Sequence, residues 1–310
     1  MLNFVKNVIV CVVFGVFTLL AADNVVIDSK KPNENVINVC MATDDNYAQH
    51  AAVTIASILK NADSEDMIRI YVIHSGLSQE NMDKLAKLKN IRDFDLVFRE
   101  LNPEALKKFD LKTNMLPVST FLRLFIPELC KDAGDRILYM DVDIVVTGSL
   151  KELWNTDLEG NAVGVVDDFL VTYKDSHTSK VFGRKNMRYF NAGVILFDLK
   201  KCEEFNIFER AIDFWVHNKE KIAFCDQDLL NESCYGVAKY LHPKFNKQNI
   251  ALRYLNGKKY DALKNKDEMK EAIEHPVIIH FASVAKPWKF WSNTQWRSEY
   301  YKYLQFTEWR

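Results

Sequence analysis

The stretch Ile137-Leu138-Tyr139-Met140-Asp141-Val142-Asp143-Ile144-Val145-Val146 decides the fold class of this chain. Its length and its branched apolar residues predict one buried β-strand. Asp141 and Asp143 are two residues apart, so both carboxylates point to the same face of an extended backbone. Two such charges in apolar surroundings need a cation between them. Carboxylate oxygens favour Mg²⁺, Mn²⁺ or Ca²⁺, although many Asp-x-Asp triplets are only solvated strand ends or caps.

The segments on both sides of this stretch alternate between strand and helix patterns. We expect strands at 36–41, 68–73, 94–98, 163–166, 191–197 and 277–281, and helices at or from 48, 79, 103, 121–125, 203–217 and 226. This order predicts an α/β fold with a mainly parallel central sheet flanked by helices. No Gly-x-Gly-x-x-Gly follows the first strand and no Walker-type loop occurs, which disfavours a dinucleotide cofactor and a P-loop NTPase.

Charge and cysteine content exclude further classes of protein. The 310 residues carry a formal net charge of −1, which argues against a broad basic surface, so we expect no nucleic-acid partner. The six cysteines show no Cys-x-x-Cys spacing. We therefore expect neither a zinc site nor a disulfide framework.

The amino terminus differs in character from the rest of the chain. An apolar run at 8–22 follows Lys6, which predicts a signal peptide or a short membrane anchor at 1–22; a wrongly assigned start codon is a third alternative. The polar segment 23–35 predicts a tether. We accordingly expect a membrane-associated, secretory-pathway or exported protein that contacts a membrane, if at all, through its N-terminus.

Polar residues follow the first predicted strand. Asp44 could accept a hydrogen bond from the N–H of a uracil, and Tyr47 could stack on the base. Turn and capping roles are the alternative for this segment, and they are favoured for Asp45.

Two further segments interrupt apolar patterns with polar residues. Asn191 and Gly193 lie inside a predicted strand, which indicates a bulge or a close approach by a ligand. Asp226, Gln227 and Asp228 begin a predicted helix, where Asp226 can be a cap and the other two are either idle or close to sugar hydroxyls.

The last polar segment runs from His280 to Trp288. His280 follows three apolar residues, so a core histidine and a third metal ligand are both open, and Lys286 could meet a phosphate. The aromatic and basic tail, 292–310, either packs as a helix on the domain or forms a surface for an acceptor or a membrane interface.

Taken together, these segments resemble glycosyltransferase family 8, the retaining nucleotide-sugar transferases that include the lipopolysaccharide galactosyl- and glucosyltransferases and glycogenin. The resemblance runs from about Val36 to Trp291 and rests on five ordered motifs: Ala42-Thr43-Asp44-Asp45-Asn46-Tyr47, Asp141-Val142-Asp143, Phe190-Asn191-Ala192-Gly193, Asp226-Gln227-Asp228 and His280 to Trp288. It implies a nucleotide-diphospho-sugar transferase fold of the GT-A type, with the glycosyltransferase domain at 36–291.

The resemblance also implies roles for the matching residues. The metal ligands are Asp141, Asp143 and His280, for Mn²⁺ or alternatively Mg²⁺. The donor-binding residues are Ala42, Asp44, Asn46, Tyr47, Arg123, Val142, Asn191, Ala192, Ser283 and Lys286. The catalytic residues are Asp168 and Asp226, which would orient sugar hydroxyls, and Gln227 and Asp228, which are considered for a covalent role. Ser283 stands where the family usually has Gly and would crowd the diphosphate loop.

The implied activity is metal-dependent, retaining transfer of galactose or glucose from a UDP-sugar to a glycan or glycolipid, such as lipopolysaccharide. Two alternatives stay open. A glycan hydrolase would need two carboxyl groups that flank the glycosidic bond, roughly 5–9.5 Å apart. A non-catalytic nucleotide-sugar or carbohydrate-binding protein would tolerate the loss of metal ligands.

Overall fold

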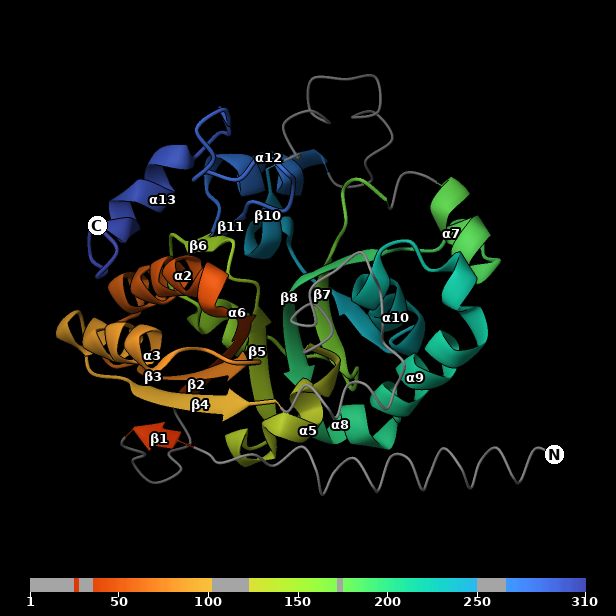
Figure 1. The fold of residues 1–310 in the computed structure, drawn as a ribbon. Helices are drawn as coiled ribbons and strands as arrows, with labels where there is room; N and C mark the ends of the chain where they lie inside the picture. Colours follow the sequence, from red (N-terminus) through yellow and green to blue (C-terminus); the bar gives the residue numbers. More distant parts are fainter. Residues whose placement is uncertain (1–24, 28–35, 102–122, 172–174, 250–265) are drawn as a thin grey trace.

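The computed structural model describes residues 25–27, 36–101, 123–171, 175–249 and 266–310 (Figure 1). The predicted leader at 1–22 and nearly all of the predicted tether at 23–35 lie outside these residues. The helix expected from residue 103 and the first part of the one expected at 121–125 lie outside them as well.

An eight-stranded sheet forms the centre of the domain, in the order β1-β4-β3-β2-β5-β8-β7-β9. These strands are β1 (Val25–Ile27), β2 (Val36–Thr43), β3 (Met67–His74), β4 (Asp95–Glu100), β5 (Arg136–Met140), β7 (Val163–Asp167), β8 (Phe190–Asp198) and β9 (Ala238–Tyr240). The neighbours β4, β3, β2 and β5 run parallel, whereas β8 is antiparallel to both β5 and β7. The predicted α/β fold with a mainly parallel sheet is confirmed.

Helices cover both faces of this sheet (Figure 1). One face packs on α2 (Ala48–Asn61) and α3 (Gln79–Ala86), and the other on α5 (Ile126–Leu129), α8 (Leu199–Glu204), α9 (Ile207–Asn218) and α10 (Cys225–Ser233). Along β2, Val39 and Met41 join the first core, while Cys40 joins the second. Because both faces are buried, the strands are continuously apolar instead of alternating.

The stretch that predicted a single strand is two strands in two sheets. After β5, the chain enters β6 (Ile144–Val146), which pairs with β11 (Ile278–His280) in a small sheet that β10 (Lys247–Gln248) completes. The Asp141 N–H still donates to the Gly193 carbonyl of the large sheet at 2.8 Å, and the Asp143 carbonyl accepts from the Phe281 N–H at 3.0 Å. The chain therefore changes sheet at Asp141–Asp143. The prediction of one continuous strand is wrong because apolar residues on both sides conceal the break.

Two helix predictions also need correction. The helix expected at 203–217 is two helices, α8 and α9, because Asn206 between them has a left-handed backbone with φ of 51°. Asp226 is not a cap, since Phe224 holds that position and Asp226 is buried in the first turn of α10.

The remaining helices are short, and the last one closes the domain. They are α6 (Lys151–Trp154), α7 (Asp175–Phe182), α12 (Lys266–Glu274) and α13 (Arg297–Leu304), with 3₁₀ turns at Asp45–Tyr47, Lys87–Asn90, Lys131–Ala133, Lys219–Lys221 and Pro243–Asn246. Helix α13 lies against α2 and buries Tyr300 and Tyr303 (Figure 1). Of the two alternatives for the tail, the structure shows the packed helix.

The predicted location at a membrane or in an export pathway is overturned. In the part of the chain that the structure describes, no helix combines the length and the apolar composition needed to cross a bilayer. The leader at 1–22, on which that prediction depended, is not among the described residues.

The contact between α13 and α2 leads to a stability prediction. The buried Tyr300 hydroxyl accepts from Gln49 Nε2 at 3.1 Å and lies 2.7 Å from His50 Nδ1. Tyr300→Phe leaves these two polar groups without their partner, so we expect a loss of about 1–3 kcal/mol in the free energy of unfolding, measured with urea. Tyr301→Phe is the matched control, because Tyr301 is 42% exposed, and its expected change is within about 0.5 kcal/mol. Equal losses in both variants would contradict this reading of the contact.

Candidate active site

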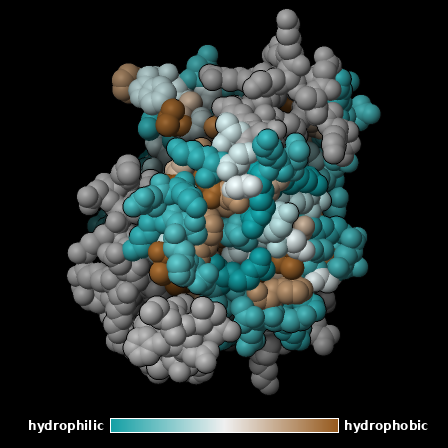
Figure 2. Space-filling view, turned by 90° about the vertical axis from the view of Figure 1, so that its right-hand side faces the viewer, coloured by the Kyte–Doolittle hydropathy of each residue, from teal (hydrophilic) through white to brown (hydrophobic). Residues whose placement is uncertain are grey.

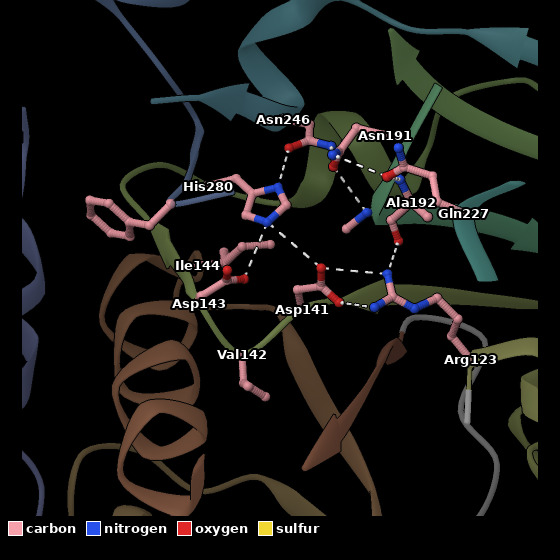
Figure 3. Close-up of polar contacts among 12 residues, drawn as sticks. Arg123, Asp141, Val142, Asp143, Ile144, Asn191, Ala192, Gln227, Asn246 and His280 are labelled. Carbon is pink, nitrogen blue, oxygen red and sulfur yellow. Dashed lines mark hydrogen bonds and ion pairs between the residues drawn. The ribbon is translucent and has the colours of Figure 1, made fainter. Parts of the chain in front are cut away.

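The change of sheet brings two carboxylates against an imidazole (Figure 3). His280 Nε2 lies 3.2 Å from Asp143 Oδ1 and 3.7 Å from Asp141 Oδ2. One ligand atom from each of the three residues lies within 4.8 Å of the others. Two carboxylates and one imidazole form a donor set that suits Mn²⁺ and related divalent cations. The predicted ligands thus converge as a metal site requires, although from a turn and not from one strand face.

Helix α2 and β5 hold the turn that carries the two carboxylates. The buried Thr54 hydroxyl donates to the carbonyls of Val142 at 3.2 Å and Ile144 at 2.8 Å. The Tyr139 hydroxyl donates to Asp141 Oδ1 at 2.6 Å. These bonds fix the backbone of the turn and the direction of the Asp141 side chain before any ligand binds.

Arg123 balances part of this negative charge. Its guanidinium lies 3.0 Å from Asp141 Oδ1 and 2.6 Å from Asp226 Oδ2, and it donates to the Ala192 carbonyl at 2.8 Å (Figure 3). Burial raises the pKa of Asp226 to about 7, against the opposing effect of Arg123 and with a further contribution from Asp141. A carboxyl group that titrates near neutral pH can accept from a sugar hydroxyl when ionised and donate to one when protonated.

Lys286 balances the second carboxylate. Its ammonium group donates to Asp143 Oδ2 and to the Phe281 carbonyl, the latter at 2.7 Å. Burial alone would raise the pKa of Asp143, but Lys286 and His280 outweigh it and hold the pKa well below its ordinary value. Asp143 is therefore ionised at neutral pH, as a metal ligand must be.

Gly193 is the residue that makes room for this cluster. A Cβ at this position would lie 2.2 Å from His280 Cε1 and 2.8 Å from Asp141 Oδ2. The pairing of β7 with β8 also shifts register between Val165 and Val166, opposite this part of β8. The sequence indicated a bulge or a close approach by a ligand; the structure shows an irregular pairing here, and protein side chains approach Gly193 closely.

Two cavities meet at the carboxylates. The first, about 270 Å³, is lined by Ala42, Thr43, Asp44, Tyr47, Arg123, Tyr139, Asp141, Val142, Asp143 and Lys286. The second, about 380 Å³, is lined by Arg123, Asp141, Asp143, Asp168, Leu170, Val171, Asn191, Ala223, Phe224, Asp226, Gln227, His280 and Ala282. Arg123, Asp141 and Asp143 line both, so one elongated ligand can occupy the two cavities with its middle at the candidate metal site.

In the first cavity, the residue that caps the 3₁₀ turn at Asp45–Tyr47 also faces the cavity. Asp44 Oδ1 accepts from the Tyr47 N–H at 3.0 Å, and both residues line the cavity. The Tyr47 ring is 40% exposed and meets the edge of Trp288 at a centroid distance of 6.2 Å. Asp45 bonds the Ser78 N–H at 2.7 Å, which is the local structural role favoured for it.

A network of side chains organises the second cavity. Asp168 Oδ2 accepts from Asn191 Nδ2 and from Gln227 Nε2, both at 3.2 Å. Gln227 Oε1 accepts from the Ala192 N–H at 3.0 Å. Four of the residues predicted to surround the sugar, Asp168, Asn191, Ala192 and Gln227, are thus already bonded to one another, whereas Asp226 pairs with Arg123.

Four predicted site residues, Asn46, Ala192, Ser283 and Asp228, lie outside both linings, and Ala192 is fully buried. Asn46 is exposed. The Ser283 hydroxyl accepts from Asn249 Nδ2 at 2.9 Å and from the Ala285 N–H at 3.2 Å, so it organises its own loop. Asp228 is fully buried.

The carboxylate of Asp228 is committed to structural bonds. It lies 2.7 Å from both His177 Nε2 and the Tyr189 hydroxyl, and it accepts from the N–H groups of Ala223 and Phe224 at 2.8 Å. Its catalytic role was predicted from position alone, and this geometry instead makes it a support for the loop that leads into α10.

Two residues that bond the candidate metal ligands Asp141 and His280 were not predicted as site residues from the sequence. Tyr139 stands two residues before Asp141, a spacing that could have suggested a shared face. Asn246, whose Oδ1 lies 2.9 Å from His280 Nδ1, comes from the distant 3₁₀ turn at Pro243–Asn246 and carries no local signal.

The surface around α7, α9 and α10 is mainly hydrophilic. Figure 2 shows this side of the molecule, where the apolar surface of the described residues is divided into small patches. Leu170 and Phe224, which are 36% and 42% exposed, line the second cavity. The cavity therefore offers apolar contacts beside its polar network.

Comparison with known proteins decides the class. The sequence profile of glycosyl transferase family 8 matches residues 38–292. The chain belongs to this family. It is 27% identical over 279 residues to general stress protein A of Bacillus subtilis (strain 168), covering 89% of this chain and 96% of that protein. It is 26% identical over 257 residues to a lipopolysaccharide 1,2-glucosyltransferase of Escherichia coli (strain K12), covering 83% of this chain and 74% of that enzyme.

The fold is similar to that of the galactosyltransferase LgtC, which was crystallised with donor and acceptor sugar analogs. The TM-score is 0.77 at 27% identity, over 88% of this chain and 96% of that chain. The predicted family, the GT-A type fold and the enzyme class are confirmed, and this family 8 protein is a retaining hexosyltransferase.

The position of Gly193 gives a prediction for this site. Gly193→Ala forces the His280 ring and the Asp141 carboxylate apart, because the new Cβ overlaps the ring. We expect calorimetry with saturating UDP to show Mn²⁺ binding weakened by roughly tenfold or more. The control is Gly148→Ala, where a Cβ meets only Val277 at 3.7 Å and should change nothing. Unchanged Mn²⁺ affinity in Gly193→Ala would show that the glycine is not needed for the cluster.

Proposed function

We propose that this family 8 hexosyltransferase transfers galactose or glucose from a UDP-sugar to a glycan or glycolipid, with Mn²⁺, or alternatively Mg²⁺, held by Asp141, Asp143 and His280. The convergence of these three side chains at the junction of two cavities carries the proposal (Figure 3). The relatives named for lipopolysaccharide sugar transfer support a glycan acceptor of that kind.

The first cavity fits the nucleotide. Tyr47 offers an exposed ring for stacking on uracil, and Asp44 offers a carboxylate acceptor for the N3–H of the base. Asn46 contributes less, because it lies outside the lining. The base would therefore be read by Asp44 and Tyr47.

The junction of the cavities fits the diphosphate. When bound, a divalent cation would stabilise the negative charge that develops on the leaving nucleotide diphosphate. Lys286, which pairs with Asp143 and lines the first cavity, would supply a second positive charge at this junction. Arg123 holds Asp141 and Asp226 in place at the border of the second cavity.

The second cavity fits the hexose. Asp168 and Asp226 would accept hydrogen bonds from sugar hydroxyls, and Asn191 fixes the direction of Asp168. Gln227 lines this cavity and Asp228 does not, so Gln227 is the better placed of the two for a role at the anomeric carbon. An acceptor sugar would pack on Leu170 and Phe224 at the same cavity.

The first test separates transfer from the two alternatives. UDP-galactose and UDP-glucose are incubated with Mn²⁺, with and without lipopolysaccharide-type glycan acceptors, and the products are analysed by mass spectrometry. We expect a glycosylated acceptor and free UDP. Cleavage of a glycan without any nucleotide-sugar would indicate a hydrolase, and tight donor binding without turnover would indicate a binding protein.

The carboxylates of the metal site lead to a mutational prediction. Asp141→Asn and Asp143→Asn each replace a charged ligand by a neutral one, so we expect transfer to fall by roughly 10²-fold or more with the fold intact by circular dichroism. Asp213→Asn on α9 is the control, since its side chain is 60% exposed and remote from both cavity linings. Near-normal rates in either site variant at saturating Mn²⁺ would refute the metal site.

The nucleotide pocket leads to a binding prediction. UDP should bind at least tenfold more tightly than CDP, because cytosine lacks the N3–H that Asp44 would accept, and an unpaired buried acceptor costs roughly 1–3 kcal/mol. Calorimetry of Asp44→Ala should show weaker UDP binding and a smaller gap between UDP and CDP. Asp45→Ala, which changes the neighbouring carboxylate outside the cavity, should keep the gap. If the wild-type protein bound GDP as tightly as UDP, the assignment of the base to Asp44 and Tyr47 would be wrong.

A further inference from the structure

A chain of hydrogen bonds leads from Gly193 to His280, one of the candidate metal ligands. None of the donor-binding or catalytic roles proposed above depends on this chain. The Gly193 N–H donates to Asn191 Oδ1 at 3.0 Å. Asn246 Nδ2 donates to the same oxygen at 2.9 Å. Asn246 Oδ1 then lies 2.9 Å from His280 Nδ1 (Figure 3).

This chain has only one consistent direction. A backbone N–H can only donate, so the Asn191 atom that faces Gly193 must be its carbonyl oxygen. The Asn246 atom that bonds this oxygen must then be the amide nitrogen, which leaves the Asn246 carbonyl oxygen facing His280. An amide oxygen can only accept, so His280 Nδ1 must carry a proton.

The carboxylates on the other side of the ring favour the opposite arrangement. Asp143 Oδ1, 3.2 Å from His280 Nε2, would attract a proton to that nitrogen. A neutral imidazole with its proton on Nε2 has no lone pair there for a metal ion. Without an acceptor at Nδ1, the two carboxylates would thus favour the form of His280 that cannot bind their shared cation.

We propose that Asn246 is a positioning residue that holds the proton of His280 on Nδ1 and so keeps the Nε2 lone pair directed at the metal site. The inference rests on the proposed metal-dependent function. Asn191 and the Gly193 N–H orient Asn246 in turn, so β8 controls the chemical form of a ligand on β11.

Burial makes this control effective. Asn246 has no exposed surface, and His280 and Asn191 are only 2% and 6% exposed. Solvent therefore cannot replace the Asn246 oxygen as the acceptor for Nδ1. Asn246 also precedes β10, which pairs in parallel with β11, so the backbone keeps its side chain beside the ring.

The test compares Asn246→Leu, which removes the acceptor at similar volume, with Asn246→Asp, which keeps an acceptor oxygen. The first readout is the His280 ring in metal-free full-length protein, by ¹H–¹⁵N correlation spectra assigned with His280→Gln. We expect a proton on Nδ1 in the wild type and in Asn246→Asp. In Asn246→Leu the proton should move to Nε2.

The second readout is the affinity for Mn²⁺ at saturating UDP, measured by calorimetry. We expect Asn246→Leu to bind Mn²⁺ about 10–100-fold more weakly than the wild type, as for other residues that orient metal-binding histidines. Asn246→Asp retains the acceptor for Nδ1 but loses the N–H that donates to Asn191, so its loss of Mn²⁺ affinity should be smaller than that of Asn246→Leu. Asn38→Leu is the control, since it removes a buried asparagine that donates to the distant Ala133 carbonyl, and it should leave both readouts unchanged.

The outcomes separate this inference from the proposed function. A wild-type ring without a proton on Nδ1, or equal Mn²⁺ affinity in Asn246→Leu and wild type, would overturn the role of Asn246 and leave the metal site standing. Failure of the wild type to bind Mn²⁺ would overturn the metal site, and the role of Asn246 with it. If Asn246→Leu does not fold, the position of the proton on the His280 ring is still measured in the wild type and in Asn246→Asp. Absence of the Nδ1 proton in either protein would refute the proposal.

Discussion

Repulsion between the Asp141 and Asp143 carboxylates is the constraint to which the surrounding structure responds. The chain brings them together where it passes from the large sheet to the small one, and apolar cores lie directly behind both. Such a pair is costly without compensation. Arg123 pairs with Asp141 and Lys286 pairs with Asp143, and His280 approaches both carboxylates from the small sheet. The divalent cation proposed above would add further positive charge between the two carboxylates.

The same constraint explains why two cavities share one border. Strands β2 and β5 end on one side of the cluster and β8 passes on the other, so the polar residues that follow each strand face a common point. On the β2 side they include Asp44 and the aromatic Tyr47, and on the β8 side they form a network of amides and carboxylates. This difference between the two cavities agrees with the nucleotide-sugar donor proposed above.

Much of this arrangement could be predicted from the sequence, because periodicity and motif spacing are local signals. The strands β2, β3 and β4 and the helix α2 match their predicted ranges within a few residues, and most of the matched motif residues line the cavities. The sheet change after Met140 was not predictable, since apolar residues flank it on both sides. Nor was the structural role of Asp228, which depends on His177 and Tyr189, 51 and 39 residues away. The position of Asn246 beside His280 likewise arises only from tertiary pairing.

The contact between Tyr300 and His50 has a consequence for how the protein is made. The two residues are 250 positions apart, and the His50 ring stacks on Trp288, which in turn meets Tyr47 in the wall of the first cavity. At a synthesis rate of about 5–20 residues per second, α2 emerges on the order of ten seconds or more before the helix that covers it. Gln49, His50 and Asn61 of α2 therefore lack their partners on α13 through most of the translation of the chain.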